Sequence, residues 1–449
     1  MELSLAEVQQ ATGAQWLGVR ESIAAHAAGW SIDTRTLAPG DVFFAIRGDR
    51  FDGHGFTKTA FERGAAAAVV SEPSDERPLL KVSDTLDALQ RLSHWARRRW
   101  GKPVVAITGS AGKTTTKDIV SELLAVRLRV GKTSGNLNNH IGLPLTLLRI
   151  PDDAEVAVVE MGMNHAGEIR QLAALAEPQF GLVTNVGYAH VESFDSIDGV
   201  AAAKRELIES LPPAGVAILN ADDELVRKFR GIHTGRTLTY GFAEDADIRA
   251  IEVEIHAEGV AFTVHNVRFQ TRLTGRHSIS NVLAGLAVAS LFGIALSELT
   301  NAVGGLTPGK MRGERSLWRG ITILNDSYNS NPEAARQMID VLASEAATRR
   351  VAVLGEMLEL GSMSETLHRR LGSYAARAGV NALIGIRGAA AFLVDEAKRA
   401  GMSERDVYFF DDPDAAGDFL RGWVRPGDAV LFKGSRGTQV ERALAKMEQ

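Results

Sequence analysis

Short apolar runs recur along the chain from residue 103 onward, and amphipathic segments separate them. Four of these runs span residues 103–107, 156–159, 181–186 and 216–220. Strands buried on both faces give continuous apolar runs, and their alternation with helical patterns is typical of a parallel sheet covered by helices. Between residues 248 and 273 polar and apolar residues alternate instead, which predicts a few antiparallel strands at the margin of this domain.

A second series of apolar runs follows the Pro308-Gly309 pair and is again interrupted by helical segments. The runs span residues 321–324, 351–354, 382–386, 407–410 and 429–432. This pattern predicts a second doubly wound, Rossmann-like α/β domain. None of its turns carries a complete Gly-x-Gly-x-x-Gly motif, so the domain need not bind a dinucleotide.

The chain before residue 98 has strand-like pieces at 42–46 and 67–70, joined by turns rich in Gly and Asp. It ends in a charged helical stretch over 85–100, whose three arginines at 97–99 we interpret as a solvated helix end. Gly101-Lys102-Pro103 then reads as a linker. These features predict a small α/β domain at the N-terminus.

A chain of 449 residues is longer than one hydrophobic core usually organises. The patterns above predict an α/β protein of three domains, spanning residues 1–98, 99–310 and 311–449. The central domain is expected to have a mostly parallel sheet.

The composition and net charge of the chain argue against several classes of function. Lys and Arg number 50 against 55 Asp and Glu, a net charge of −5, so nothing indicates a nucleic-acid partner. There is no cysteine, which excludes disulfides and thiolate metal sites. No apolar run approaches ~18 residues and the N-terminus lacks a signal pattern, so we expect a cytoplasmic protein without membrane insertion. No heptad repeat is visible, which makes a monomer the expected state.

The segment 108–117, Thr-Gly-Ser-Ala-Gly-Lys-Thr-Thr-Thr-Lys, lies between an apolar run and an amphipathic one at 118–128. A strand, a glycine loop and a helix in this order form a phosphate-binding loop, in which Lys113 reaches the terminal phosphates and the Thr114 hydroxyl holds magnesium. The spacing is a variant, because only two residues separate the glycines. The alternative, a glycine turn before a surface helix, is disfavoured by the flanking elements. The predicted nucleotide-binding residues here are Gly109, Ser110, Ala111, Gly112, Lys113, Thr114 and Thr115.

Three further residues are candidates for chemistry. Glu160 directly follows the run 156–159, so it lies at the strand edge where ligands bind in open α/β sheets, although it could also only cap the next segment. His190 comes just past another strand and could ligate a divalent cation, whereas most lone histidines are structural. Lys204 lies on a predicted helix, and physical reasoning alone reads it as a solvated lysine.

Five motifs together resemble the Mur ligase superfamily, whose members are ATP-dependent amide-forming enzymes of cell-wall precursor synthesis. They are the phosphate loop, Asn136-Leu-Asn-Asn139, Glu160-Met-Gly162, Thr184-Asn-Val-Gly-Tyr-Ala-His190 and Ala203-Lys204. The segment Gly275–Asn281 continues the resemblance and implies an adenine contact for Asn281. Ser278 stands where asparagine is common in the superfamily.

Within the superfamily, three stretches are similar to the branch that adds D-alanyl-D-alanine. They span residues 325–332, 354–361 and 432–437. The Asp-Asn-Pro-Arg motif of the diaminopimelate- or lysine-adding relatives is absent. The resemblance covers nearly the whole chain and implies two small-molecule substrates, UDP-N-acetylmuramoyl-tripeptide and D-alanyl-D-alanine. They would be joined in an ATP-dependent reaction through an acyl phosphate.

The resemblance also implies roles for individual residues. Lys113, His190 and Lys204 would be catalytic, and Arg312 and Asp326 would contact the phosphates and the ribose of ATP. Two magnesium ions would be held by Thr114, Glu160, His190 and Lys204, the last as a carbamate. Substrate contacts are implied for Ser31, Thr34, Arg35, Arg47, Asn138, Asn139, Asn329 and Asn331. Arg47 could equally pair with an acidic residue.

The resemblance implies a separate role for each domain. Residues 1–98 would bind the UDP substrate, residues 99–310 would bind ATP, and residues 311–449 would form the Rossmann-like ligase part. Linkers near residues 100 and 309 are the expected hinges. Two other functions remain open at this stage. One is a folylpolyglutamate-type or other Mur-type ligase, and the other is a nucleotide-switched binding protein, although the guanine-reading Asn-Lys-x-Asp motif is absent.

Overall fold

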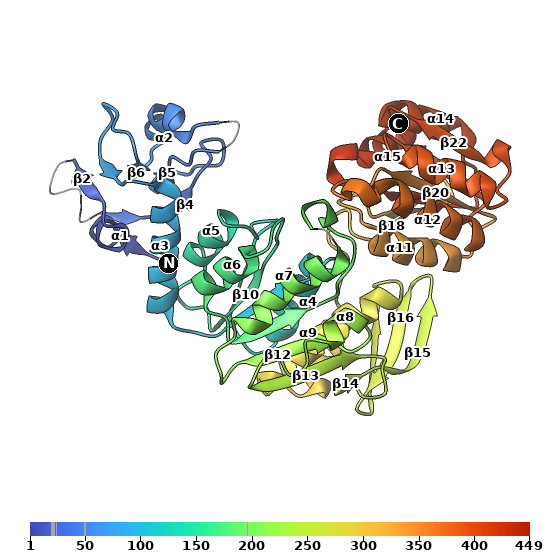
Figure 1. Ribbon diagram of the computed structural model, residues 1–449, viewed down its shortest axis with the longest axis horizontal. Coiled ribbons are helices and arrows are strands. Elements are labelled where there is room, and N and C mark those ends of the chain that lie inside the picture. Colours follow the sequence, from blue (N-terminus) through green and yellow to red (C-terminus); the bar gives the residue numbers. More distant parts are fainter. Residues whose placement is uncertain (19–22, 24, 49–50, 195) are drawn as a thin grey trace.

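The computed structural model describes residues 1–18, 23, 25–48, 51–194 and 196–449. Figure 1 shows three α/β bodies that follow one another along the chain, coloured blue, green to yellow, and orange to red. Each body has its own sheet. The predicted α/β fold class with a mostly parallel central sheet is confirmed.

The N-terminal body is built on a five-stranded sheet of order β2-β7-β6-β5-β4, in which only β2 runs antiparallel to its neighbour. Its strands are β2 Gln15–Leu17, β4 Gly29–Ser31, β5 Asp41–Phe44, β6 Ala67–Val70 and β7 Leu79–Lys81, with β1 Leu3–Ser4 and β3 His26–Ala27 as a separate pair. Its helices are α1 Leu5–Thr12, α2 Thr57–Glu62 and α3 Thr85–Trp100. The expected boundary after residue 98 falls within the last turn of α3.

The central body has a seven-stranded parallel sheet of order β14-β13-β12-β11-β8-β10-β9. Its strands are β8 Val104–Thr108, β9 Val130–Lys132, β10 Val156–Glu160, β11 Phe180–Val183, β12 Val216–Asn220, β13 Arg236–Gly241 and β14 Ile248–Arg249. The helices are α4 Lys113–Leu124, α5 Gly142–Leu148, α6 Glu168–Ala176, α7 Ile197–Glu209, α8 Glu224–Arg227, α9 Arg276–Leu291 and α10 Thr300–Gly304. The predicted antiparallel strands form a separate sheet of β15 Ile251–His256, β16 Gly259–Val264 and β17 Val267–Thr271.

Helices cover both faces of the central sheet, and the two-residue side-chain period of a strand explains how. In β8, Val104 and Ala106 join one buried cluster, while Val105 and Ile107 join another. The first cluster includes residues of α6 and α7, and the second includes residues of α4 and α9. Both faces of the strand are therefore apolar, which is why the sequence reads as a continuous run.

The C-terminal body has a six-stranded sheet of order β18-β19-β23-β20-β21-β22, parallel except for the edge strand β18. Its strands are β18 Glu314–Trp318, β19 Ile321–Asn325, β20 Arg349–Gly355, β21 Ala382–Ile386, β22 Val407–Phe410 and β23 Asp428–Lys433. Its helices are α11 Pro332–Ser344, α12 Ser364–Arg377, α13 Ala390–Arg399, α14 Pro413–Trp423 and α15 Val440–Glu448. The doubly wound domain expected here is present.

The start of α11 brings the C-terminal body against the central one. Asn331, the N-cap of α11, donates from Nδ2 to the carbonyl oxygen of Ser110 at 3.1 Å. Glu333 accepts the backbone N–H of Tyr188 at 3.1 Å. These contacts join α11 to the loops that follow β8 and β11, so the carboxyl edge of the central sheet faces the C-terminal body. In the described part of the chain, no helix has the length and apolar character needed to cross a membrane.

Candidate functional site

A cleft of about 1280 Å³ lies between the central and C-terminal bodies. Phosphate-loop residues 110–115 form part of its wall, together with the strand-end residue Glu160. Arg312, Asp326 and Asn329 line it from the C-terminal side. The predicted ATP site, apart from Gly109, is therefore assembled around one cavity.

The phosphate loop joins β8 to α4, which begins at Lys113 and not at residue 118 as the amphipathic pattern predicts. The first turn of α4 consists of Lys and Thr residues and carries no apolar signal, which explains the difference. Gly109 and Gly112 have φ of +153° and +77°, a region that other residues rarely adopt. A Cβ on Gly109 would also overlap the Thr184 hydroxyl. This loop therefore requires glycine at position 109 for two independent reasons.

We expect Gly109→Ala to lower ADP affinity about a hundredfold or more, because the loop must move to remove the overlap with Thr184. Isothermal titration calorimetry with ADP measures the effect. Gly422→Ala is the matched control, since its added Cβ meets nothing within 4 Å. ADP affinity equal to that of the wild type in Gly109→Ala would show that this loop does not bind the phosphates.

Asn185 holds the phosphate loop from the neighbouring strand end, a role that sequence reasoning missed. Its carbonyl oxygen accepts the N–H of Ser110 at 3.0 Å, and its side-chain oxygen accepts the N–H of Ala111 at 2.8 Å. Its side-chain amide donates back to the Ala111 carbonyl at 3.0 Å. β11 ends at Val183, earlier than its apolar run predicts, and the following residues turn toward the loop. Asparagine after a strand is a common turn signal, so the sequence did contain a hint.

Lys113 points back over the loop and donates from Nζ to the carbonyl oxygen of Gly109 at 2.8 Å. Burial lowers the pKa of its ammonium, and among nearby charges the carboxylate of Glu160 opposes this most strongly. Lys113 lines the cleft, so a phosphate group bound by the loop would meet its ammonium.

Glu160 is 2% exposed and is surrounded by uncharged hydrogen-bond donors. It accepts the Thr114 hydroxyl at 2.8 Å and the Asn138 side-chain amide at 2.7 Å. Glu160 forms no ion pair among the described residues, and the ammonium of Lys113 acts on it only at longer range. Carboxylate and hydroxyl oxygens suit Mg²⁺, which usually takes one or two protein carboxylates plus phosphates and water. The residues present therefore fit a magnesium ion, although no cluster of three His, Cys, Asp or Glu forms within the described ranges.

His190 lies at the start of a 3₁₀ helix, with φ of +60°. Its Nδ1 is 2.5 Å from Oε2 of Glu359, which belongs to the C-terminal body. The His190 imidazole lowers the pKa of Glu359, the largest of several effects on that carboxyl. The sequence pattern predicted a functional role for His190 but did not predict its contact with Glu359.

Lys204 is buried in α7, with 1% of its surface exposed. Burial lowers the pKa of its ammonium well below the usual value, and the charge of Lys113 adds to this shift. No hydrogen bond or ion pair of its ammonium occurs in the described part of the chain. The reading of Lys204 as a solvated lysine is wrong, because its side chain is buried, where the charged form is disfavoured.

The C-terminal wall of the cleft holds the other implied ligands. Asp326 forms an ion pair with buried Lys433, which also donates to the Asn329 carbonyl at 3.0 Å. The Arg312 guanidinium stacks 3.9 Å from the ring centroid of Tyr328. Arginine and a carboxylate therefore face the phosphate loop from across the cleft.

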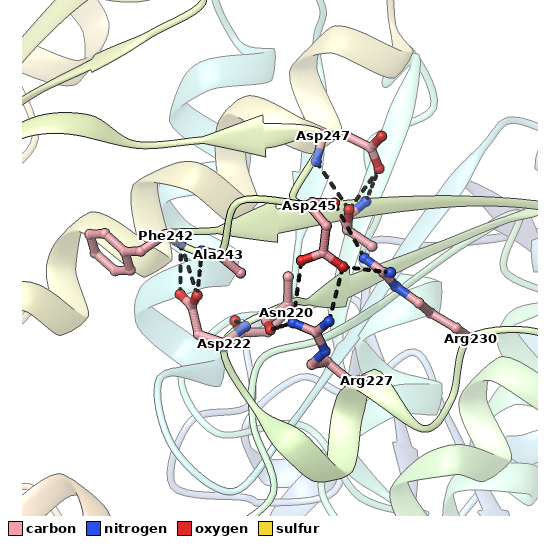
Figure 2. Close-up of polar contacts among 10 residues, drawn as sticks. Asn220, Asp222, Arg227, Arg230, Phe242, Ala243, Asp245 and Asp247 are labelled. Carbon is pink, nitrogen blue, oxygen red and sulfur yellow. Dashed lines mark hydrogen bonds and ion pairs between the residues drawn. The ribbon is translucent and has the colours of Figure 1, made fainter.

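Residues at the β12 and β13 strand ends also line the cleft, which sequence reasoning missed. The carboxylate of Asp222 accepts the backbone N–H groups of Phe242 and Ala243 at 2.9 Å. Asp245 pairs with Arg227 and Arg230, each at 2.9 Å. These contacts hold the 242–247 segment in place (Figure 2).

Two asparagines implied as ligands take part in local structure. Asn281 on α9 accepts the Thr116 hydroxyl at 3.2 Å and lines the cleft. Asn139 accepts the backbone N–H of Gly142 at 2.9 Å at the start of α5 and also borders the cleft.

The four N-terminal residues with implied substrate contacts do not line the cleft. Ser31 is buried and bonds the backbone of Asp33. Thr34 and Arg35 lie near the surface, and Arg35 pairs with Asp33 at 2.6 Å. Arg47 pairs with two acidic residues, Asp52 and Glu72, as its alternative reading supposed.

The fold and the cleft define a three-domain α/β nucleotide-binding protein. Residues 26–99, 107–289 and 311–436 match the "Mur ligase family, catalytic domain", the "Mur ligase middle domain" and the "Mur ligase, glutamate ligase domain". The chain belongs to the Mur ligase family.

Relatives that match over more than nine tenths of both chains share a more specific name. A Bacillus subtilis UDP-N-acetylmuramoyl-tripeptide--D-alanyl-D-alanine ligase is 36% identical, with 92% of this chain and 91% of the relative covered. The Escherichia coli protein of that name is 35% identical, with 93% of each covered. A MurF structure from Acinetobacter baumannii superimposes with a TM-score of 0.91 and 29% identity, covering 100% of this chain and 99% of that one. A Thermotoga maritima MurF structure in complex with ADP superimposes with a TM-score of 0.83 and 29% identity. The match covers 94% of this chain and 97% of that one.

Proposed function

We propose that this chain is an ATP-dependent ligase that joins D-alanyl-D-alanine to UDP-N-acetylmuramoyl-tripeptide. The observation that carries the proposal is the cleft, in which the phosphate loop with Lys113 and the buried carboxylate of Glu160 face a second α/β body. The relatives named for this reaction match along nearly the whole chain. ADP, phosphate and the pentapeptide precursor of peptidoglycan are the products.

The reaction needs an activated carboxyl group, because a carboxylate does not condense with an amine in water. A carboxylate oxygen of the tripeptide attacks the γ-phosphorus, the bond to the β,γ-bridging oxygen breaks, and ADP leaves. The amine nitrogen then attacks the acyl carbon, the bond to the phosphate oxygen breaks, and the surplus amine protons pass to solvent. Lys113 stabilises the charge on the transferring phosphate.

Thr114 and Glu160 would hold a magnesium ion, which neutralises phosphate charge when bound. A second ion would be held by His190 and by Lys204 after carbamylation. Asn281, Arg312 and Asp326 orient the nucleotide, and Asn138, Asn139, Asn329 and Asn331 face the substrates. Ser31, Thr34, Arg35 and Arg47 bind the uridine nucleotide on the N-terminal body.

This assignment divides the chain into residues 1–98 for the UDP substrate, 99–310 for ATP and 311–449 for the ligase domain. It places the enzyme in the cytoplasm as a monomer. We expect the two linkers near residues 100 and 309 to act as hinges, so that domain closure excludes water from the acyl phosphate. Small-angle scattering is expected to show a smaller radius of gyration with an ATP analogue and both substrates, and an unchanged profile would contradict this.

The direct test is ADP release by the purified protein with Mg²⁺, ATP and UDP-N-acetylmuramoyl-tripeptide. D-alanyl-D-alanine is compared with free amino acids, glutamate among them, and with no amine. Release that requires both substrates and selects the dipeptide supports the proposal. Turnover with a different amine would move the specificity to another ligase of this superfamily. Turnover that ignores every acceptor would favour a nucleotide-switched protein.

A further inference from the structure

Glu359 brings a carboxylate from the C-terminal body to the catalytic edge of the central sheet. Its Oε2 lies 2.5 Å from Nδ1 of His190, a residue that lines the cleft. The ammonium of Lys113 is within electrostatic range of the same carboxylate. Glu359 is therefore close to the place where phosphate transfer and amide formation would occur.

The loop that carries Glu359 is held firmly by hydrogen bonds from three directions. The N–H of Met357 donates to Nε2 of buried His368 at 2.9 Å, and the N–H of Leu358 donates to Oγ of Ser435 at 2.9 Å. The carbonyl oxygen of Glu359 itself accepts the N–H of Glu192, in the central body, at 3.1 Å. These bonds fix the backbone that carries Glu359, and the contact with His190 places its Oε2.

Glu359 also has a backbone conformation that is costly for its residue type. Its φ is +63°, in the left-handed region that favours glycine. Such conformations are unfavourable for residues other than glycine and persist where the surrounding structure enforces them, often at functional sites. The unfavourable φ and the anchoring hydrogen bonds together indicate that Glu359 has a functional role.

The carboxylates of the C-terminal body that line the cleft already have partners. Asp326 pairs with Lys433. Glu333 accepts the N–H of Tyr188, and burial raises the pKa of its carboxyl. Asp340 accepts the hydroxyl of Tyr374. None of these three is free to bind a further cation.

Glu359 differs because one of its oxygens remains available. Its side chain is 57% exposed, and Oε2 alone contacts His190. Within the described ranges, Oε1 has no hydrogen-bond or ion-pair partner. A preorganised carboxylate with an open oxygen beside the phosphate loop is suited to a small cationic group that must approach the acyl phosphate.

We propose that Glu359 binds the ammonium group of the incoming amine substrate and holds it beside the phosphate loop. This inference rests on the proposed function, because the ligase reaction is what brings an amine to this place. A charge-assisted hydrogen bond from the ammonium to Oε1 would hold the nitrogen near the acyl carbon, which the nitrogen attacks once it has lost one proton to solvent. Glu359 is then a determinant of amine binding that is separate from the ATP contacts.

The test is a steady-state comparison of wild type and Glu359→Gln, which removes the charge and keeps the shape. The KM for D-alanyl-D-alanine is expected to rise about tenfold to a hundredfold, the equivalent of one charge-assisted hydrogen bond. The KM values for ATP and UDP-N-acetylmuramoyl-tripeptide are expected to stay within twofold. Glu365→Gln, on an exposed carboxylate of α12, is the matched control and should change none of the three.

Glu359→Asp keeps the charge and is expected to recover part of the lost dipeptide affinity. A thermal melt of each variant checks that the loop change leaves the fold intact. An unchanged dipeptide KM in Glu359→Gln, or equal losses for all three substrates, would overturn the inference. A failure of the proposed function is distinguished by the wild-type enzyme alone, because the wild type would then show no turnover with the dipeptide. The amine that it does use would replace the dipeptide in the same comparison.

Discussion

Replacing Lys113 with methionine is expected to reduce ADP release in the full reaction about a thousandfold, or ~4 kcal/mol in transition-state stabilisation. The Lys113 ammonium lies on the loop that faces the cleft and donates to the Gly109 carbonyl at 2.8 Å. Phosphoryl transfer depends mainly on positioning and on neutralising charge, so a side chain of similar length without charge removes a large part of the catalysis. Stopped-time measurement of ADP with both substrates present gives the rate.

The same experiment needs a variant that changes a lysine without touching the site. Lys398→Met serves, since Lys398 is exposed near the end of α13. Calorimetric titration of ADP separates binding from catalysis, and we expect Lys113→Met to lose less in ADP affinity than in rate. A Lys113→Met enzyme with more than a tenth of the wild-type rate would contradict the assigned role.

The apolar pattern predicted the strands that position the site. The run at 216–220 is β12, and the run at 382–386 is β21. Such runs are visible because both faces of a parallel strand are buried. The edge strand β18 was not predicted, since its residues are mostly exposed and carry no continuous apolar signal.

Rules about strand ends also predicted part of the site. Thr114 lies in the first turn of α4, which follows β8, and Glu160 is the last residue of β10. Because β8 lies beside β10 in the sheet, the two side chains meet at 2.8 Å. Glu359 was not predicted, because its role depends on a contact with His190 across 169 positions of sequence and between two bodies. No local pattern encodes the packing of one domain on another.

Lys204 is the clearest case in which the structure changes a physical reading. An amphipathic helix with one lysine predicts a solvated ammonium, yet this side chain is 1% exposed. Only the docking of α7 on the sheet determines which of its faces is covered. The resemblance to a family, not the physics of the segment, had nominated this residue.

A buried amine without a partner is suited to carbamylation. Burial lowers the pKa of Lys204 well below its usual value, so a larger fraction is unprotonated at neutral pH. The unprotonated nitrogen would attack CO₂ and lose one proton, which would turn the neutral amine into an anion with two oxygens. That anion would relieve the repulsion from Lys113 and offer oxygen ligands to a magnesium ion.

We therefore expect Lys204→Ala to lose about a thousandfold or more in the rate of ADP release and to be partly restored by high concentrations of short-chain carboxylic acids. An acid of that size can occupy the space of the missing side chain and replace its carboxylate. Lys228→Ala, at an exposed lysine of the same body, should keep the wild-type rate and should not respond to the acids.

Mass spectrometry of the intact protein at high bicarbonate supplies a second readout that does not depend on turnover. The wild type is expected to gain the mass of one CO₂, and Lys204→Ala is expected not to gain it. Rescue without the mass change would point to labile carbamylation, because the anion formed at Lys204 loses CO₂ once bicarbonate is removed. If neither rescue nor mass change occurred, Lys204 would act as an unmodified buried amine, and the anionic ligand would have to come from another residue.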